Sequence, residues 1–305
     1  MDRRQTIPAH LRLTLQDFLD RFPNDDACLE FLKEKRYPNG VAHCEKCGVV
    51  RKHHRVTGRP AYACDSCGSM ISPMAGTIFE HSSTSLRKWF YAMYLMGSTR
   101  CGISAKQIQR ETGVTYKTAW RMFRQIRSLL SEPDMQLEGT TVEMDETYVG
   151  GRRHRKYQAR RGRPSPNDPS KTCVVGAVER KGRVFACVAD DATKATFHGV
   201  ARERILPESV IFTDEHHSYT GLKEMGYTHQ RIQHSQGVYV LGNVHTNTIE
   251  GFWSLVKRGI AGVYHNVSRK YLQTYLDEYS FRYNRRDQGN LIFTSILERV
   301  CERAV

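Results

Sequence analysis

Two pairs of cysteines constrain the N-terminal part of this chain more tightly than any other feature. They are CEKC, with Cys44 and Cys47, and CDSC, with Cys64 and Cys67, each followed directly by a glycine. Each pair presents two thiolates from one tight turn, and two such turns complete a tetrahedral ligand set for Zn²⁺. Disulfides are the alternative, but they are rare in the reducing cytoplasm. We predict a structural zinc ribbon over residues 40–75.

The charge of the chain indicates the class of its partner. Its 305 residues include 46 lysines and arginines against 32 acidic residues, a formal net charge of +14. Such an excess is typical of proteins that bind nucleic acid. No apolar stretch approaches the roughly 18 residues of a membrane span. The opening MDRRQTIPAHLRL also lacks the apolar core of a secretory signal. We expect a cytoplasmic, nucleoid-associated protein that binds DNA and no membrane.

A helix-turn-helix pattern follows the ribbon, within residues 104–130. Ser104 and Gln107 form a capping-box start, Gly113 is a helix stop, and Thr115 can cap a second helix. The second helix of such a motif enters the major groove of DNA, although an ordinary helical hairpin has the same pattern. The basic residues that we expect to contact DNA from this helix are Lys117, Arg121 and Arg124.

The periodicity changes after residue 140, from helical to alternating. We predict strands over 141–150, 172–180, 183–190, 209–215 and 227–233, and helices over 193–205, 247–261, 268–285 and 291–303. Three antiparallel strands, a helix, and then strands alternating with helices is the element order of a ribonuclease H-like fold of the integrase type. The predicted fold class is therefore multidomain α+β. Its predicted domains are N-terminal helices (1–39), the zinc ribbon (40–75), the helix-turn-helix domain (76–132) and the catalytic domain (140–305).

Three acids of the catalytic domain lie where this fold brings them together. Asp145 lies in the first, central strand, Asp214 ends the fourth strand beside it, and Glu250 begins a later helix. Three carboxylates are the hard oxygen ligands that two Mg²⁺ ions need in phosphodiester chemistry. Lys257 falls on the same edge of the helix as Glu250, two turns further along.

Other readings of these acids remain open. Asn247 and Glu250 have the spacing of a capping box, so Glu250 is also a candidate for closing the helix start. By strand alternation Glu146 faces away from Asp145, whereas Glu143 shares its face, and the neighbour Glu215 is an alternative to Asp214.

Further basic residues are candidates for holding the DNA backbone. Residues 151–171 read as a loop rich in Arg, Lys and Pro, and so dense a charge of one sign suits phosphates. We also expect Arg282, Arg285 and Arg286 to hold backbone. The remaining DNA-contact candidates are Arg152, Arg153, Arg155, Lys156, Arg160, Arg161, Lys257 and Arg258.

Three stretches carry a resemblance to a known family: MDETYVGG, FTDEHHSY and the long segment from HTNTIEGFWSLVKRG to YSFRYNRR. With the zinc ribbon, they make nearly the whole chain similar to the zinc-ribbon-bearing DDE transposases of bacterial insertion sequences. The resemblance implies that Asp145, Asp214 and Glu250 bind Mg²⁺ or Mn²⁺, and that Lys257 contacts DNA near the reacting phosphate. Because some members of this family have Asn as the third residue, the resemblance also makes Asn247 an alternative to Glu250. It also implies specific binding to terminal inverted repeats and action as an oligomer, which we expect to be a dimer on DNA.

The predicted function is that of a transposase that cleaves the strand at the element end and transfers it to target DNA. The alternatives are a metal-dependent nuclease or resolvase of the same fold, and a catalytically inactive zinc-ribbon and helix-turn-helix regulator.

Overall fold

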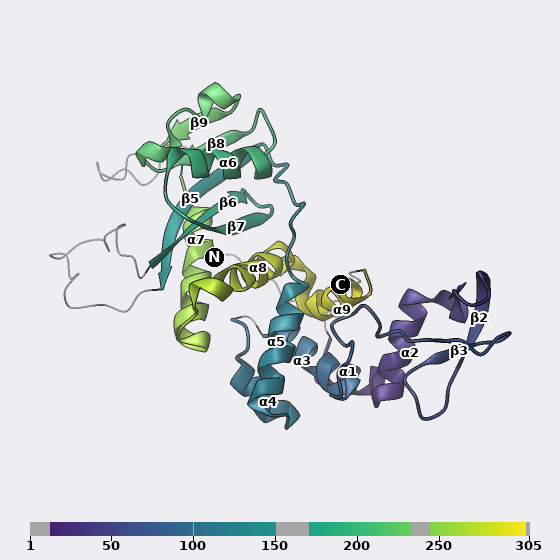
Figure 1. The fold of residues 1–305 in the computed structure, drawn as a ribbon. Coiled ribbons are helices and arrows are strands. Elements are labelled where there is room, and N and C mark those ends of the chain that lie inside the picture. Colours follow the sequence, from purple (N-terminus) through teal and green to yellow (C-terminus); the bar gives the residue numbers. More distant parts are fainter. Residues whose placement is uncertain (1–12, 100, 151–170, 233–244, 303–305) are drawn as a thin grey trace. The chain divides into compact units, whose positions relative to one another are not determined.

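The structure is a computed structural model that describes residues 13–99, 101–150, 171–232 and 245–302. It comprises two compact units (Figure 1). Unit 1 falls within Met1–Leu129 and Asp287–Val305, and unit 2 is Leu130–Arg286. In the described part of the chain, every helix is too short or too polar to cross a bilayer.

Unit 1 contains an antiparallel four-stranded ribbon and a set of helices. The ribbon strands pair in the order β1–β2–β3–β4, which confirms a ribbon in the predicted place. Their bounds are β1 Val41–Cys44, β2 Val49–Arg55, β3 Tyr62–Cys64 and β4 Met70–Ile71. The helices are α1 Leu15–Arg21, α2 Asp25–Arg36, η2 Pro38–Gly40, α3 Leu86–Ser98, α4 Ala105–Thr112, α5 Tyr116–Ser128 and α9 Ile292–Glu302, the last preceded by η8 Arg286–Leu291.

The helix α9 lies outside the unit in which we predicted it. Our catalytic domain ran to residue 305, but α9 packs on α3 in unit 1. Phe293 of α9 lies among aromatic rings of α1 and α3, with ring centroids 5.8 Å from Phe18 and 5.9 Å from Tyr94. Gly97 permits this contact, because a Cβ there would come within 2.8 Å of the Phe293 backbone. Periodicity identified the helix correctly, but it carries no information about which core a helix joins.

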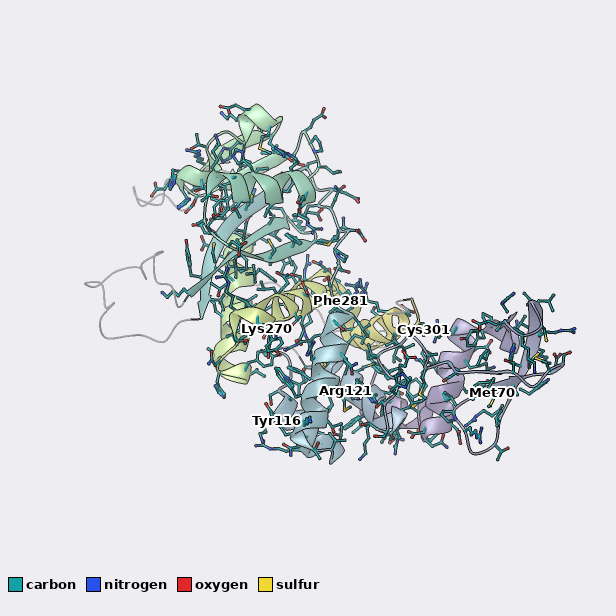
Figure 2. All side chains as sticks on the ribbon, in the orientation of Figure 1. Met70, Tyr116, Arg121, Lys270, Phe281 and Cys301 are labelled. Carbon is teal, nitrogen blue, oxygen red and sulfur yellow. The ribbon has the colours of Figure 1, made fainter. Side chains whose placement is uncertain are left out.

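Helices α4 and α5 lie where the two helices were predicted and are joined by a short turn, while their role as a DNA-binding helix-turn-helix stays a prediction. The Ser104 hydroxyl accepts a hydrogen bond from Gln107 N, and Thr115 Oγ1 accepts one from Thr118 N. Gly113 ends α4 with a φ of 68°, a left-handed conformation that favours glycine. Figure 2 labels Tyr116 and Arg121, two exposed side chains of α5. These contacts explain the sharp turn between the helices.

Unit 2 is built on a five-stranded sheet of order β7–β6–β5–β8–β9. The first three strands in sequence are antiparallel, and β8 and β9 continue parallel to β5. This confirms the ribonuclease H-like topology, with the first strand central and the fourth beside it. The strands are β5 Thr141–Gly150, β6 Lys171–Glu179, β7 Val184–Ala189, β8 Val210–Thr213 and β9 Thr228–Arg231, and the helices are α6 Lys194–Arg204, η4 His217–Tyr219, η5 Lys223–Met225, α7 Asn247–Gly259, η7 Ile260–Tyr264 and α8 Arg269–Asn284.

Helices cover both faces of this sheet (Figure 1). Val142 and Met144 of β5 face a core that includes Phe197 of α6. Val149 faces the opposite core, with Ile249 of α7 and residues of α8. Odd-numbered residues of β5 therefore face α7. Since β6 is buried on both faces, it reads as an almost unbroken apolar run.

Candidate active site and cysteine cluster

Asp145 lies on the face of β5 that α7 covers. Its Oδ2 accepts a hydrogen bond of 3.0 Å from the indole Nε1 of Trp253 on α7. The residue opposite Asp145 on β6 is Gly176, where an added Cβ would come within 2.6 Å of the Trp253 ring. The missing side chain therefore makes room for the indole, which reaches across the sheet to the carboxylate.

Asp214 follows β8 directly. Because Glu143 of β5 pairs in parallel register with Phe212 of β8, Asp214 comes level with Asp145 on the neighbouring strand. Asp214 Oδ1 accepts a hydrogen bond of 2.9 Å from His216 N, which turns the chain away from the strand. The strand pairing predicted from sequence thus places these two acids level with each other, on the central strand and at the end of the strand beside it.

Glu250 lies in the first turn of α7, and its side chain is exposed. Its Oε1 accepts a hydrogen bond of 3.1 Å from the hydroxyl of Thr246. The N-cap of α7 is Thr246, and Asn247 is the exposed first helical residue, so the capping box considered for Asn247 and Glu250 is not formed. Glu250 is therefore not needed to close the helix start.

The electrostatics of Asp145 indicate that the three acids are near one another. Its pKa is raised to about 8, first by burial and then by the negative charges of Glu146, Asp214 and Glu250. The carboxylate oxygens are more widely spaced than the cysteine sulfurs. In the described residues only the cysteines gather three or more ligand atoms within 4.8 Å.

The neighbouring acids have other partners. Glu146 accepts a hydrogen bond of 2.8 Å from the hydroxyl of Tyr219, a residue of the core on the α6 side, so it points away from Asp145 as strand alternation predicts. Burial, followed by the charge of Asp214, raises its pKa. Glu143 does share the face of Asp145, but it is fully buried and bonded to the start of α7. Glu215 is exposed.

The basic residues of α7 are exposed, whereas Arg282 of α8 is engaged in the fold. Lys257 and Arg258 both reach solvent, and among the described residues Lys257 forms no ion pair with Glu250. Arg282 is buried and ion-paired with Glu278 at 2.7 Å.

Two further arginines also have partners within unit 2. Arg285 is ion-paired with Glu132 at 2.9 Å, and Arg286 donates to the carbonyl oxygens of Gly182 and Tyr283. Our expectation that these three arginines hold DNA backbone is contradicted for Arg282, which is buried, whereas for Arg285 and Arg286 it stays a prediction.

The remaining predicted DNA contacts divide into exposed and undescribed residues. On α5, the exposed side chains include Lys117, Arg121 and Arg124, while Phe123 and Ile126 are buried on the other side. Arg121 also donates to Gln125 of the same helix. The predicted contacts of the basic loop, which are Arg152, Arg153, Arg155, Lys156, Arg160 and Arg161, lie outside the described residues.

The four cysteines form a compact cluster in unit 1. Their sulfur atoms all lie within 4.8 Å of one another, with Cys44 and Cys67 3.5 Å apart and Cys47 and Cys64 3.8 Å apart. A tetrahedral Zn²⁺ with bonds of about 2.3 Å requires sulfurs roughly 3.8 Å apart, so the cluster fits zinc. Gly48 and Gly68 adopt the positive φ that the tight turns require.

Sequence reasoning missed the side chains that hold these elements in place. Neither the hydrogen bond from Trp253 nor the cap from Glu143 has a local motif. Strand alternation places Glu143 beside Asp145, and the glycine opposite Asp145 is a weak sign of a close contact. Both signs become specific only when the partner helix is known.

Comparisons with known proteins agree with this architecture. Residues 136–284 match the family model of the ISXO2-like transposase domain, and residues 23–70 match that of the transposase zinc-ribbon domain. An uncharacterised protein of the transposable element ISH50 from Halobacterium salinarum is 32% identical over 91% of this chain and 97% of its own length. An uncharacterised transposase-like protein from Haemophilus influenzae is 28% identical over 39% of this chain and 94% of its own length.

Among solved structures, the Mos1 strand transfer complex is similar over 66% of this chain and 73% of that chain. Its TM-score of 0.30 and identity of 11% are too low to carry an argument. The two family models and the relative that matches over nearly its full length are sufficient to assign the family. The chain belongs to the transposase family that joins an N-terminal zinc ribbon to an ISXO2-like DDE transposase domain.

Proposed function

We propose that this protein binds the terminal inverted repeats of its element, cleaves a DNA strand at the element end, and joins the freed 3′ end to target DNA. The observation that supports the proposal is the placement of Asp145 on the central strand, Asp214 directly after the strand beside it, and Glu250 on the helix that Trp253 joins to Asp145. A purely structural role would not require three acids at one place on a strongly basic protein.

The donor set suits Mg²⁺ or Mn²⁺. Both ions prefer hard oxygen ligands, and the three carboxylates supply them. Burial first, and then the neighbouring carboxylates, raise the pKa of Asp145 to about 8, and a divalent cation would offset the repulsion between these carboxylates. When bound, two such ions would activate the attacking oxygen and stabilise the leaving oxygen of the phosphodiester.

The residues around the acids have separate roles in this proposal. Trp253 orients the carboxylate of Asp145 through its indole N–H. Lys257, two turns beyond Glu250 on α7, holds a phosphate beside the scissile bond, and Arg258 contacts backbone. The exposed basic side of α5 and the basic loop 151–171 bind the element end.

The cysteine cluster holds a structural Zn²⁺ in this proposal. Four thiolates fill all four positions of a tetrahedral ion, so the cluster leaves no open position for substrate. Its role is to fix the ribbon, whose short strands bury few apolar side chains.

The test uses the purified full-length protein and duplexes that carry the terminal repeats flanking its own gene. With Mg²⁺ we expect strand cleavage at the repeat and then joined products with a target plasmid, and neither in EDTA. Cleavage without joining would identify a nuclease or resolvase instead. Specific binding without either reaction would identify an inactive regulator. Sedimentation of the protein with and without these duplexes tests whether it binds DNA as a dimer.

A further inference from the structure

The buried acid Glu143 has a role that neither metal binding nor DNA binding explains. Its side chain is completely inaccessible to solvent, and it lies two residues before Asp145 on the same face of β5. Its Oε2 accepts hydrogen bonds from Thr248 N at 2.8 Å and from Ile249 N at 3.1 Å. Its Oε1 accepts from the Thr248 hydroxyl at 2.9 Å and from Arg180 Nε at 2.8 Å.

These bonds cap α7 from a strand that is distant in sequence. The first four N–H groups of a helix have no partner within it, and they carry partial positive charge. The N-cap residue Thr246 offers no side-chain cap. The carboxylate of Glu143 takes over this task, because it accepts from two of these amides and brings a negative charge to the positive end of the helix.

Arg180 connects this cap to the rest of the sheet. Arg180 follows β6 and forms an ion pair with Glu143. Its Nη2 donates a hydrogen bond of 2.9 Å to the carbonyl oxygen of His245. Its guanidinium also lies over the ring of Phe212, 4.5 Å from the centroid. The ring nitrogen Nδ1 of His245 lies 3.2 Å from Glu143 Oε1. The chain that enters α7 is therefore tied to β5, β6 and β8 together.

The position of Glu250 depends on this attachment. Its side chain is exposed and accepts a hydrogen bond from the Thr246 hydroxyl at the start of the same helix, so its place follows that of the helix start. The backbone of Glu250 lies between Ile249, whose amide bonds Glu143, and Trp253, whose indole bonds Asp145. The same strand thus fixes the helix on both sides of Glu250.

We propose that Glu143 is a positioning residue for the metal-binding carboxylates. Its buried carboxylate, neutralised by Arg180, holds the start of α7 and thereby sets where Glu250 stands relative to Asp145 and Asp214. The inference rests on the proposed function, since it assumes that these three acids bind the divalent ions.

Glu143 is not itself a metal ligand. Each of its two oxygens already accepts two hydrogen bonds, which uses the lone pairs that an ion would need. It also has no solvent-accessible surface. Positioning and ligation therefore give different expectations for the same substitution.

The test is Mn²⁺ binding by the full-length protein without DNA, measured by calorimetry and by electron paramagnetic resonance. Glu143→Gln keeps the side-chain shape but removes the charge and one acceptor oxygen. We expect its Mn²⁺ affinity to fall about 10- to 100-fold, as is typical when a partner behind metal ligands is lost. Cleavage should recover at raised metal concentration, because the three ligands are still present.

Glu179→Gln is the matched control. Glu179 is also a buried carboxylate, and it accepts hydrogen bonds from the backbone N–H groups of Glu138, Gly139 and Arg183, none of which belongs to α7. We expect Glu179→Gln to lower the melting temperature while leaving the Mn²⁺ affinity unchanged. A general loosening of unit 2 would weaken binding in both variants and would overturn the inference.

A milder variant decides the question if Glu143→Gln fails to fold. Thr248→Val removes one hydroxyl donor to Glu143 and keeps the helix amides, so we expect a loss of Mn²⁺ affinity of about two- to tenfold, the equivalent of one hydrogen bond. Unchanged affinity in the folded variants would overturn the inference. So would a loss in Glu143→Gln that excess metal cannot restore, because that result would make Glu143 a ligand. If the unsubstituted protein binds no Mn²⁺ that Asp145→Asn abolishes, the proposed function itself is wrong.

Discussion

The cysteine cluster of unit 1 and the carboxylate site of unit 2 are assembled in different ways. The cysteines lie between residues 44 and 67, and two tight turns bring their sulfurs within 4.8 Å of one another. The proposed metal-binding acids are spread between residues 145 and 250, and they approach one another only through the pairing of β8 with β5 and the packing of α7 on the sheet. Local geometry builds the first site, whereas the fold of the whole unit builds the second.

This difference determines which substitutions should weaken metal binding at each site. A closed cluster of thiolates depends on its own ligands, because four bonds to one ion fix their positions. In our proposal the carboxylate site depends as well on residues that supply no ligand atom, since Glu143, Arg180 and Gly176 contact α7 or the chain that enters it. We therefore expect the carboxylate site to be sensitive to many more positions than the cysteine cluster.

The largest expected effect is on catalysis, from the carboxylate ligands. Asp145→Asn, Asp214→Asn and Glu250→Gln should each reduce strand cleavage by well over the ~100-fold that is typical of residues behind the ligands. Binding to element-end DNA and the zinc content should stay unchanged. The measurement is cleavage of a labelled element end in Mg²⁺.

Glu215→Gln is the control for this series, because Glu215 is an exposed neighbour of Asp214. It should remain active. If Glu250→Gln is active and Asn247→Ala is inactive, the third metal ligand is Asn247. The carboxylate site that we compare with the cysteine cluster would then contain Asn247 in place of Glu250.

The next effect is on the stability of the ribbon. Cys44→Ser or Cys64→Ser should lower the bound zinc from about one equivalent to a small fraction, because structural zinc is coupled to folding. The ribbon should become sensitive to proteases, while Mn²⁺ binding at the carboxylates of unit 2 should persist. Elemental analysis measures the bound zinc, and limited proteolysis measures the stability of the ribbon. Cys101→Ser, at an exposed cysteine outside the cluster, should change neither. Full zinc retention in both ligand variants would show that these cysteines are not the ligands.

A smaller effect should come from Gly176→Ala, a residue that pairs with Asp145 across the sheet but supplies no ligand atom to either metal. Its Cβ would lie 2.6 Å from ring carbons of Trp253, so the indole must shift away from Asp145. We expect a loss of about 1–3 kcal/mol in the free energy of unfolding of unit 2, with weaker Mn²⁺ binding.

The matched control is Gly199→Ala on α6, where an added Cβ meets nothing within 4 Å. It should be neutral or stabilising by up to about 1 kcal/mol, as is usual for glycine replacement inside a helix. Equal effects at both glycines would contradict the idea that the carboxylate site depends on residues beyond its ligands.

The sequence predicted well those features that follow from short-range pattern. The cysteine spacing indicated the ribbon, alternation indicated the strands to within about two residues, and element order indicated the ribonuclease H-like sheet. That topology in turn placed Asp145 beside Asp214. Each of these conclusions depends on local periodicity or on a small set of permitted sheet connections.

The features that depend on side-chain contacts across the fold could not be predicted in the same way. The hydrogen bond from Trp253 and the cap from Glu143 join residues more than a hundred positions apart. Arg282 was misjudged although a signal was present, because Glu278 lies one helical turn before it and can pair with it. Likewise, the apolar stripe of α9 does not tell which of two cores it joins.

The smallest effect should come from Lys257, and it tests whether the exposed edge of α7 serves DNA or the fold. Lys257 is exposed and, in the described part of the chain, is not ion-paired with Glu250. Two helical turns, or roughly 10 Å of rise, separate these residues, so the ammonium can hold a phosphate while the carboxylate holds metal. Lys257→Ala should reduce the slope of log affinity against log salt by about 0.9, the value for one lost phosphate contact. It should also slow joining.

The melting temperature of Lys257→Ala should barely change, because exposed substitutions away from special contacts usually stay within about 0.5 kcal/mol. Arg269→Ala is an informative control, since Arg269 is exposed but ion-paired with Asp190 at 2.8 Å. Affinity for element-end DNA across a salt series, together with a melting curve, separates the two roles. A lower melting temperature with an unchanged salt slope would mean that Lys257 stabilises unit 2. In that case α7 would contact no DNA at this position, and Lys257 would serve only to stabilise the fold.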